Sequence, residues 1–292
     1  MCSHQSKIER YVAADGRPLA VHVWDTNEPP RAQAVFLHGI SSHAGWYEPG
    51  NAHLAAAGVR VHFLDRRGSG VNSANRGDVD HWQTWISDVA IYLRQLAEAT
   101  SLPVALCGIS WGGKLAAAVA RSHPELIDAL ALLCPGLYSP FEPGVIKRLV
   151  LRVPVPQAIE RRRIRIPLRD PELFTDNGTW QRFIVEDANK LRDITWRFAR
   201  EDRKLSYFAR QAAPELTMPL LLMLAGRDRI IDNPRVIEFF NRVPRRAKSM
   251  IRYPKAEHTL EFETHPQAYF DDLAKWLRTR KASRKAQHAA SS

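Results

Sequence analysis

The apolar positions of the chain follow two different spacings in turn. Short apolar runs with strand character, such as "AVFLHG", "VRVHFLD" and "PVALCGI", predict buried strands. Between them lie longer stretches with helical spacing. The clearest, "HWQTWISDVAIYLRQLAEA", places four apolar residues near one face: Trp85, Val89, Tyr92 and Leu96. Strands that alternate with helices predict an α/β fold with a mostly parallel sheet covered on both faces.

The start of the chain and one interruption complete the predicted architecture. "KIERYVAADGRPLAVHVW" predicts two strands joined by a turn at Asp15 and Gly16, which indicates an antiparallel edge. After residue 135 the pattern becomes irregular, helical and rich in arginine and proline until the next core strand, which predicts an inserted cap. The predicted domains are a core in two parts, a helical cap or lid and a disordered basic tail: 1–135 with 214–281, 136–213 and 282–292.

Composition restricts the class of protein. The chain has 292 residues, 45% of them hydrophobic, which fits one large domain or one domain with an insertion. Three cysteines, Cys2, Cys107 and Cys134, are too few for a secreted disulfide framework and favour a reducing compartment. No signal peptide is recognisable, and no apolar run approaches the ~18 residues that a membrane span needs. The sequence therefore predicts a cytoplasmic protein.

The positive charge of the chain is concentrated in two segments. The formal net charge is +11, to which residues 141–170 contribute +5 (eight Lys/Arg and three Asp/Glu) and residues 275–292 contribute +6 (six Lys/Arg). Residues 146–153 interleave apolar and basic side chains. This pattern fits a lid on an anionic membrane surface, and it fits equally a lid that covers a pocket while its arginines face water. No aromatic stacking pattern or reading motif indicates nucleic-acid binding.

Candidate chemistry centres on Ser110 in "LCGISWGG". Gly108, Ser110 and Gly112 form a G-x-S-x-G sequence between a buried strand and a helix of small residues. Such a corner strains the serine backbone and lifts its hydroxyl clear of the sheet, which predicts a nucleophile.

A serine nucleophile needs a histidine base, which follows the acid in the chain order of this architecture. His288 is in the predicted tail, and His265 precedes a proline at a predicted helix start. His258 follows the last strand in a loop, and we identify it as the base.

The acid that orients the base should follow the strand "LLLML". Asp228 does so, whereas Asp232 lies closer to the next helix and suits an N-terminal cap. We predict Asp228 as the acid, with Asp232 as the alternative.

The tetrahedral intermediate requires two backbone donors. The amide of Trp111 follows the nucleophile, and the amide of Ile40 lies in the loop after "AVFLHG". His38 ends that strand, and we expect it to tie down its own loop.

Five segments in order, "FLHGISSHAGWY", "LDRRGSGVNS", "CGISWGGKLA", "AGRDRIID" and "AEHTLEF", resemble the signatures of the α/β-hydrolase fold. Over residues 7–280 the chain is similar to the monoacylglycerol lipase, lysophospholipase and serine aminopeptidase branch. The resemblance implies a mostly parallel eight-stranded sheet with an inserted helical cap. It also implies a catalytic triad and a backbone oxyanion hole: Ser110, Asp228 and His258, with Ile40 and Trp111. Two features depart from the family, namely Ser69 where histidine is usual and the arginine-rich cap sequence "ERRRIRIP".

We therefore expect a serine hydrolase that cleaves an acylglycerol or lysophospholipid-like ester through an acyl-enzyme at Ser110. The alternatives are a peptidase, thioesterase or acyltransferase with the same triad, or a non-catalytic binding protein on the same scaffold. Without metal-ligand spacing or a phosphate-binding motif, we expect no metal and no cofactor. The expected partner is a small ester or lipid. Peripheral contact with an anionic membrane stays open, as does the oligomeric state.

Overall fold

An eight-stranded sheet forms the centre of the computed structural model, which describes residues 6–141, 155–244 and 248–282. Its strand order is β1-β2-β4-β3-β5-β6-β9-β10. The strands are β1 (Lys7–Val12), β2 (Pro18–Trp24), β3 (Ala32–Leu37), β4 (Val59–Leu64), β5 (Val104–Ile109), β6 (Ala129–Leu133), β9 (Leu220–Ala225) and β10 (Lys248–Tyr253). The β1–β2 and β2–β4 pairs are antiparallel and the other pairs are parallel, which confirms the predicted sheet and its antiparallel edge.

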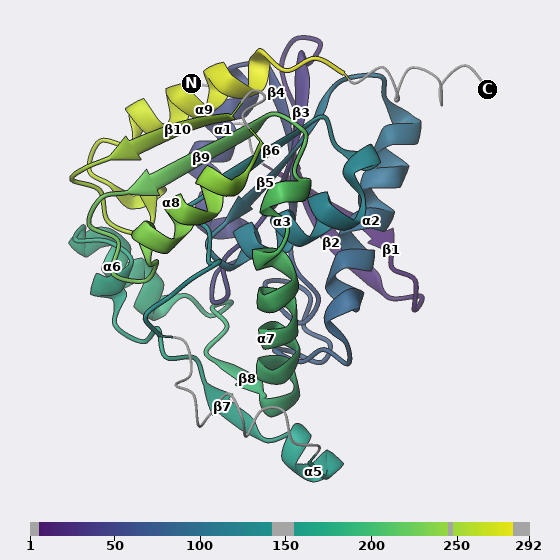
Figure 1. Cartoon of the computed structure of the whole chain (residues 1–292), viewed down its shortest axis with the longest axis vertical. Helices are drawn as coiled ribbons and strands as arrows, with labels where there is room; N and C mark the ends of the chain where they lie inside the picture. Colours follow the sequence, from purple (N-terminus) through teal and green to yellow (C-terminus); the bar gives the residue numbers. More distant parts are fainter. Residues whose placement is uncertain (1–5, 142–154, 245–247, 283–292) are drawn as a thin grey trace.

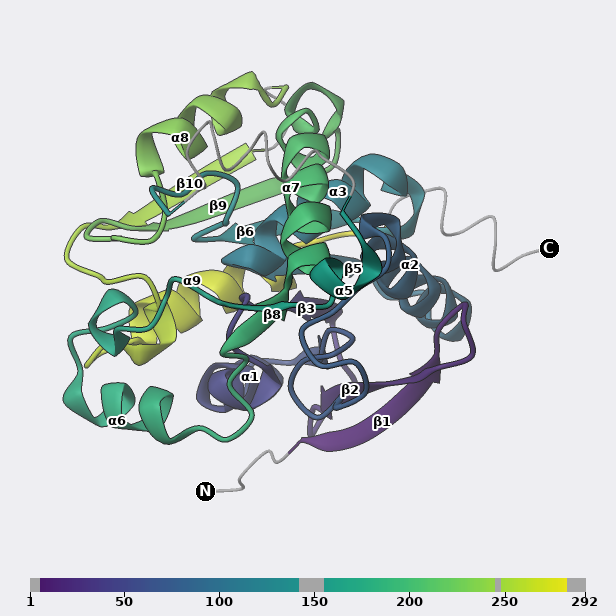
Figure 2. The same ribbon diagram turned by 90° about the horizontal axis from the view of Figure 1, so that it is seen from below.

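Helices cover both faces of this sheet (Figures 1 and 2). On one face α1 packs beside α9, and on the other α2 packs beside α3, with α8 further along that face. Their bounds are α1 (Glu48–Ala56), α2 (Trp82–Ala99), α3 (Trp111–Ser122), α8 (Asn233–Arg242) and α9 (Gln267–Arg278). Every residue of β3, β5, β6 and β9 is buried, because these strands have a helix layer on each side.

Small residues bring α3 unusually close to the strands that flank it. A Cβ atom at Gly112 would lie 2.1 Å from the carbonyl oxygen of Leu37, at the end of β3. A Cβ atom at Gly108 would lie 2.5 Å from the carbonyl oxygen of Gly112. The glycines of the G-x-S-x-G sequence are therefore required by backbone contact, and they let the helix start directly above the carboxyl ends of the strands.

The chain between β6 and β9 leaves the sheet. Its described part, residues 155–213, is called the intervening segment here and gathers at one end of the molecule, in front of the strands when seen from below (Figures 1 and 2). It contains α5 (Gln157–Glu160), β7 (Arg163–Arg165), η3 (Pro171–Leu173), α6 (Gly178–Glu186), β8 (Asp193–Thr195) and α7 (Trp196–Arg210). The division of the chain at residues 136 and 213 stays a prediction.

The two-stranded antiparallel sheet of β7 and β8 was not predicted. Ile164 lies opposite Ile194 in its register. Strands of three residues are too short to show a period of two, and the arginines on either side of Ile164 resembled a solvated surface.

Two segments about which the sequence makes predictions lie wholly or mostly outside the described residues. The apolar and basic run 146–153 and most of the tail, 283–292, lie outside them. Within them, no helix has the length and apolar character needed to cross a membrane. Cys107 and Cys134 are both buried and free.

Candidate active site

Ser110 lies at the turn from β5 into α3 with a strained backbone. Its φ of 52° and ψ of −120° lie where side chains other than glycine rarely occur, at a cost of about 1–3 kcal/mol. Three hydrogen bonds hold this turn. The Ser110 N–H donates to the carbonyl of Leu133 (2.9 Å), and the Ser110 carbonyl accepts from the N–H groups of Gly113 (2.8 Å) and Gly136 (2.6 Å). The surrounding backbone thus fixes the hydroxyl at the carboxyl end of the sheet.

His258 reaches Ser110 from the loop after β10. Its Nε2 lies 3.0 Å from the Ser110 Oγ, and its Nδ1 lies 2.8 Å from the Oδ2 of Asp228. The ring of Phe174 contacts the imidazole edge to face at 6.0 Å between centroids. Because a carboxylate can only accept, Nδ1 donates to Asp228 and Nε2 is left to accept the Ser110 proton.

Asp228 is held by its own loop. Its side chain is fully buried, and its Oδ1 accepts from the N–H groups of Ile230 (2.8 Å) and Ile231 (2.9 Å). Asp232, the alternative acid, instead occupies the N-cap of α8 and accepts from the N–H of Arg235 at 3.2 Å. The structure therefore brings Asp228 to His258 and places Asp232 in the capping position.

The loop after β3 lies beside the nucleophile. A Cβ atom at Gly39 would be 3.4 Å from the Cβ of Ser110, so the backbone passes very close to the serine. Among the hydrogen bonds between described residues, none uses the N–H of Ile40 or Trp111 as a donor. Both expected oxyanion donors are thus unused next to Ser110.

His38 has a structural place in this loop, as expected. Its Nδ1 donates to the carbonyl of Gly39 (2.7 Å), and its Nε2 accepts from the N–H of Arg66 (2.9 Å). Burial lowers the pKa of His38 to about 3, so the ring is neutral at physiological pH.

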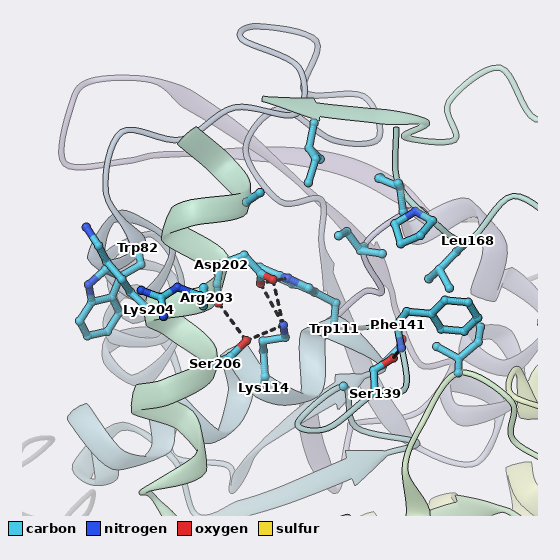
Figure 3. Close-up of a pocket in the computed structure, with 18 of the residues that line it drawn as sticks. Trp82, Trp111, Lys114, Ser139, Phe141, Leu168, Asp202, Arg203, Lys204 and Ser206 are labelled. Carbon is cyan, nitrogen blue, oxygen red and sulfur yellow. Dashed lines mark hydrogen bonds and ion pairs between the residues drawn. The ribbon is translucent and has the colours of Figure 1, made fainter. Parts of the chain in front are cut away.

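A cavity of about 670 Å³ opens on Ser110 and Trp111. This volume is in the range that holds a small organic ligand. Most of its wall is apolar and comes from several parts of the chain: Phe141, Ile164, Ile166, Leu168, Ile230 and Ile231. Figure 3 shows Phe141 and Leu168 together on one side of Trp111.

A polar cluster on the other side of Trp111 was missed in the sequence (Figure 3). The buried Lys114 ammonium donates to Asp202 Oδ1 (2.9 Å) and to Ser206 Oγ (2.9 Å). Asp202 also accepts from the indole N–H of Trp111 at 2.5 Å. Lys114 lies one helical turn after Ser110, in the buried stretch of α3 from Trp111 to Ala120, where every other residue is glycine or apolar. A single lysine in such a stretch was the signal that could have indicated a partner facing the site.

In the described part of the chain, no group of three or more histidine, cysteine or acidic side chains is arranged to hold a metal ion.

A mostly parallel sheet with Ser110, His258 and Asp228 in hydrogen-bonded line at its carboxyl edge defines the α/β-hydrolase class. Within that class, the chain belongs to the family described as serine aminopeptidase, S33, whose model matches residues 28–265.

Individual relatives agree with this assignment. The monoacylglycerol lipase of Mycolicibacterium smegmatis is 26% identical over 284 residues, covering 95% of this chain and 99% of the relative. A soluble variant of monoglyceride lipase from Saccharomyces cerevisiae, solved with a substrate analogue, superposes with a TM-score of 0.82 at 19% identity, covering 94% and 95% of the two chains. An abhydrolase domain-containing protein of Dictyostelium discoideum is 24% identical over 280 residues. The match covers 94% of this chain but only 29% of that longer protein.

These findings confirm the predicted resemblance to the monoacylglycerol lipase branch and the predicted fold. They also confirm the predicted class of enzyme, a serine-dependent carboxylic ester hydrolase.

Proposed function

We propose that this enzyme hydrolyses a lipid-like carboxylic ester through an acyl-enzyme at Ser110. One observation carries the proposal, namely the line from Asp228 through His258 to Ser110, which ends on a largely apolar cavity. The line supplies a nucleophile with its base and orienting acid, and the cavity supplies a place for an acyl chain.

The reaction proceeds in two halves. His258 Nε2 takes the hydroxyl proton as Ser110 Oγ attacks the ester carbonyl carbon, and the amides of Ile40 and Trp111 hold the oxygen that becomes negative. Protonated His258 then gives its proton to the leaving alcohol, which leaves an acyl group on Ser110. A water molecule, deprotonated by His258, attacks that acyl group and releases the carboxylic acid. Asp228 stays ionised and keeps His258 in the tautomer that accepts at Nε2.

For the substrate we propose an acylglycerol or lysophospholipid-like ester. The relatives that support this choice carry the name monoacylglycerol or monoglyceride lipase. The apolar wall formed by residues such as Ile166, Leu168 and Ile231 suits an alkyl chain, since its burial removes apolar surface from water.

The charge of the cavity argues against an aminopeptidase. Among the described residues, five basic side chains line the cavity against one acidic side chain: Lys114, Arg165, Arg203, Lys204 and Arg210 against Asp202. An aminopeptidase must bind the free ammonium group of its substrate, and an anionic side chain complements that charge best. Asp202 is already bonded to Lys114 and is not free to pair with an ammonium group, so the lining suits a neutral ester better than a substrate with a free amine.

The test combines labelling with turnover. A fluorophosphonate probe should modify Ser110 once, as located by peptide mass spectrometry, and Ser110→Ala should abolish labelling. The same substitution should lower kcat on a short soluble ester by several orders of magnitude, with residual activity from the oxyanion hole. The enzyme should cleave a 1-monoacylglycerol faster than an aminoacyl amide, the kind of substrate that an aminopeptidase would prefer. Labelling that persists on another serine of the Ser110→Ala variant contradicts the proposal.

A further inference from the structure

A second feature of the site concerns Arg66, which follows β4 and is almost completely buried, with 8% of its surface exposed. Its guanidinium donates from Nη2 to the carbonyl of Ile40 (2.9 Å) and from Nη1 to the carbonyl of Gly39 (3.4 Å). Among the described residues, no carboxylate lies within ion-pair distance of it. A buried cation without a paired carboxylate is costly, so its presence calls for a role that outweighs the cost.

The bond to Gly39 determines the direction of the expected oxyanion donor. The carbonyl of Gly39 and the N–H of Ile40 belong to one peptide unit, which is planar and trans, so the two groups point in opposite directions. Arg66 and His38 both donate to this carbonyl. By holding the carbonyl on the side of Arg66, they direct the N–H of Ile40 toward the opposite side. A hydrogen bond to the carbonyl also polarises the peptide and strengthens its N–H as a donor.

The same guanidinium contacts the residue that supplies the other expected donor. It stacks on the indole of Trp111 at 4.4 Å from the ring centroid and lies 5.6 Å from the ring of Phe198. The indole N–H of Trp111 bonds to Asp202 in turn. Arg66 therefore links the two residues expected to supply the oxyanion donors, and it holds the side chain of Trp111 from one face.

We propose that Arg66 is a positioning residue for the oxyanion hole, which fixes the Gly39–Ile40 peptide and places a positive charge behind it. This inference rests on the proposed function, because it needs an oxyanion to form at Ser110. Burial lowers the pKa of Arg66 to about 9, which still leaves the guanidinium charged at neutral pH. In the sequence, Arg66 is the first arginine of "LDRRGSG", whereas the second, Arg67, pairs with Asp15 and Asp88 away from the site.

Arg76 offers a matched control. It is a cation that also donates to two backbone carbonyls, those of Gly70 and Asn189, but neither belongs to the Gly39–Ile40 peptide. Replacement of either arginine by glutamine therefore removes one charge and the same kind of hydrogen bond. Only the replacement of Arg66 should affect the oxyanion.

The experiment measures steady-state kinetics on a short soluble ester for wild type, Arg66→Gln, Arg66→Lys and Arg76→Gln, per mole of folded protein. Loss of a direct oxyanion donor lowers kcat by about 10²–10³-fold, so loss of a residue that positions one should lower it by roughly 10–100-fold. For Arg66→Gln we expect that fall in kcat with KM within about twofold, since the substrate carbonyl carries no full charge. Affinity for a trifluoromethyl ketone, which forms an oxyanion adduct, should fall by the same factor. Arg76→Gln should match wild type in both.

Arg66→Lys keeps the proposal testable if the glutamine variant does not fold. It retains the charge but cannot donate to two carbonyls from one plane, so kcat should lie between the values for wild type and Arg66→Gln. Wild-type kcat and ketone affinity in either folded Arg66 variant overturn the inference, even if the melting temperature falls. A wild-type protein that forms no adduct at Ser110 overturns the proposed function and this inference together. An adduct at Ser110 with unchanged Arg66→Gln kinetics overturns the inference alone.

Discussion

Replacement of Asp228 by asparagine tests the proposed triad through its hydrogen-bond geometry. In the native site Asp228 Oδ1 accepts from two backbone N–H groups, while Oδ2 accepts from His258 Nδ1. An asparagine that keeps its oxygen on the two amides must turn its NH₂ group toward Nδ1. Nδ1 then has to accept, the ring proton moves to Nε2, and Nε2 can no longer take the proton of Ser110.

The size of the effect follows from the cost of the opposite orientation. If the asparagine side chain is reversed, its oxygen faces His258 and the active tautomer is restored, but the amides of Ile230 and Ile231 lose their acceptor. Each buried donor left without a partner costs about 1–3 kcal/mol, so the reversed orientation is less stable by about 2–6 kcal/mol. At 1.4 kcal/mol for each tenfold change, kcat should fall by roughly 30- to 20,000-fold.

The assay is kcat on a short soluble ester, with melting temperature as the measure of folding. Asp232→Asn is the control, because asparagine caps a helix as well as aspartate and the bond to the Arg235 N–H is retained. Its kcat should stay within about twofold of wild type. If Asp228→Asn keeps wild-type kcat, or if Asp232→Asn is the more damaging substitution, Asp228 is not the acid of this site.

Two further predictions concern stability. Burial raises the pKa of Glu261 to about 7, although the Tyr269 hydroxyl donates to its carboxylate at 2.7 Å. Between about pH 4.5 and 7 the folded state therefore binds more protons than the unfolded state. The free energy of unfolding of the wild type should therefore fall by about 3 kcal/mol as the pH rises through that window, whereas that of Glu261→Gln should not. Urea unfolding at pH 5 and pH 8 measures this difference, and equal pH dependence of the two proteins contradicts the assignment. Gly112→Ala would bring a Cβ atom to 2.1 Å from the Leu37 carbonyl oxygen and should lower the free energy of unfolding by about 1–3 kcal/mol or more. In the same assay Gly178→Ala, whose Cβ atom would meet no atom within 4 Å, should be neutral or slightly stabilising. Comparable losses in both variants would refute the contact argument.

The sequence predicted the central strands of the sheet well because their burial is uniform. Strands β3, β5, β6 and β9 are covered on both faces, so they read as continuous apolar runs between helical patterns. The pairing of β7 with β8 escaped prediction because it joins residues 163–165 to residues 193–195, which lie far apart in the chain. Local periodicity carries no information about such a pairing.

The residues of the candidate site also divide into those that the sequence predicts and those that it does not. Ser110, Asp228 and His258 could be proposed because each stands directly after a recognisable strand, and the carboxyl ends of parallel strands lie at one edge of the sheet. The contacts of Lys114 with Asp202, and of Arg66 with Ile40, could not be proposed. Each joins residues from different loops or layers, and a charged side chain in the sequence gives no sign of whether it will face water or the interior.

The intervening segment contacts three parts of the chain that carry the proposed chemistry: the loop after β3 (the oxyanion loop), the loop after β10 (the base loop) and the start of α3. It holds the oxyanion loop, because the Leu191 N–H donates to the carbonyl of Ser41 at 2.9 Å. It holds the base loop, because the Thr259 N–H donates to the carbonyl of Phe174 at 2.9 Å. It holds the start of α3 through Asp202, which binds both Trp111 and Lys114.

A fourth contact shows how firmly the intervening segment is attached. Asp187, at the end of α6, accepts from His43 Nε2 (3.1 Å) and from the indole N–H of Trp46 (2.7 Å). Burial opposes the charge of this carboxylate, but the two donors hold the pKa of Asp187 at about 2, so the carboxylate is ionised throughout the physiological range. Because these contacts end beside Ser110, removal of the Asp187 or Asp202 carboxylate should alter kcat as well as KM.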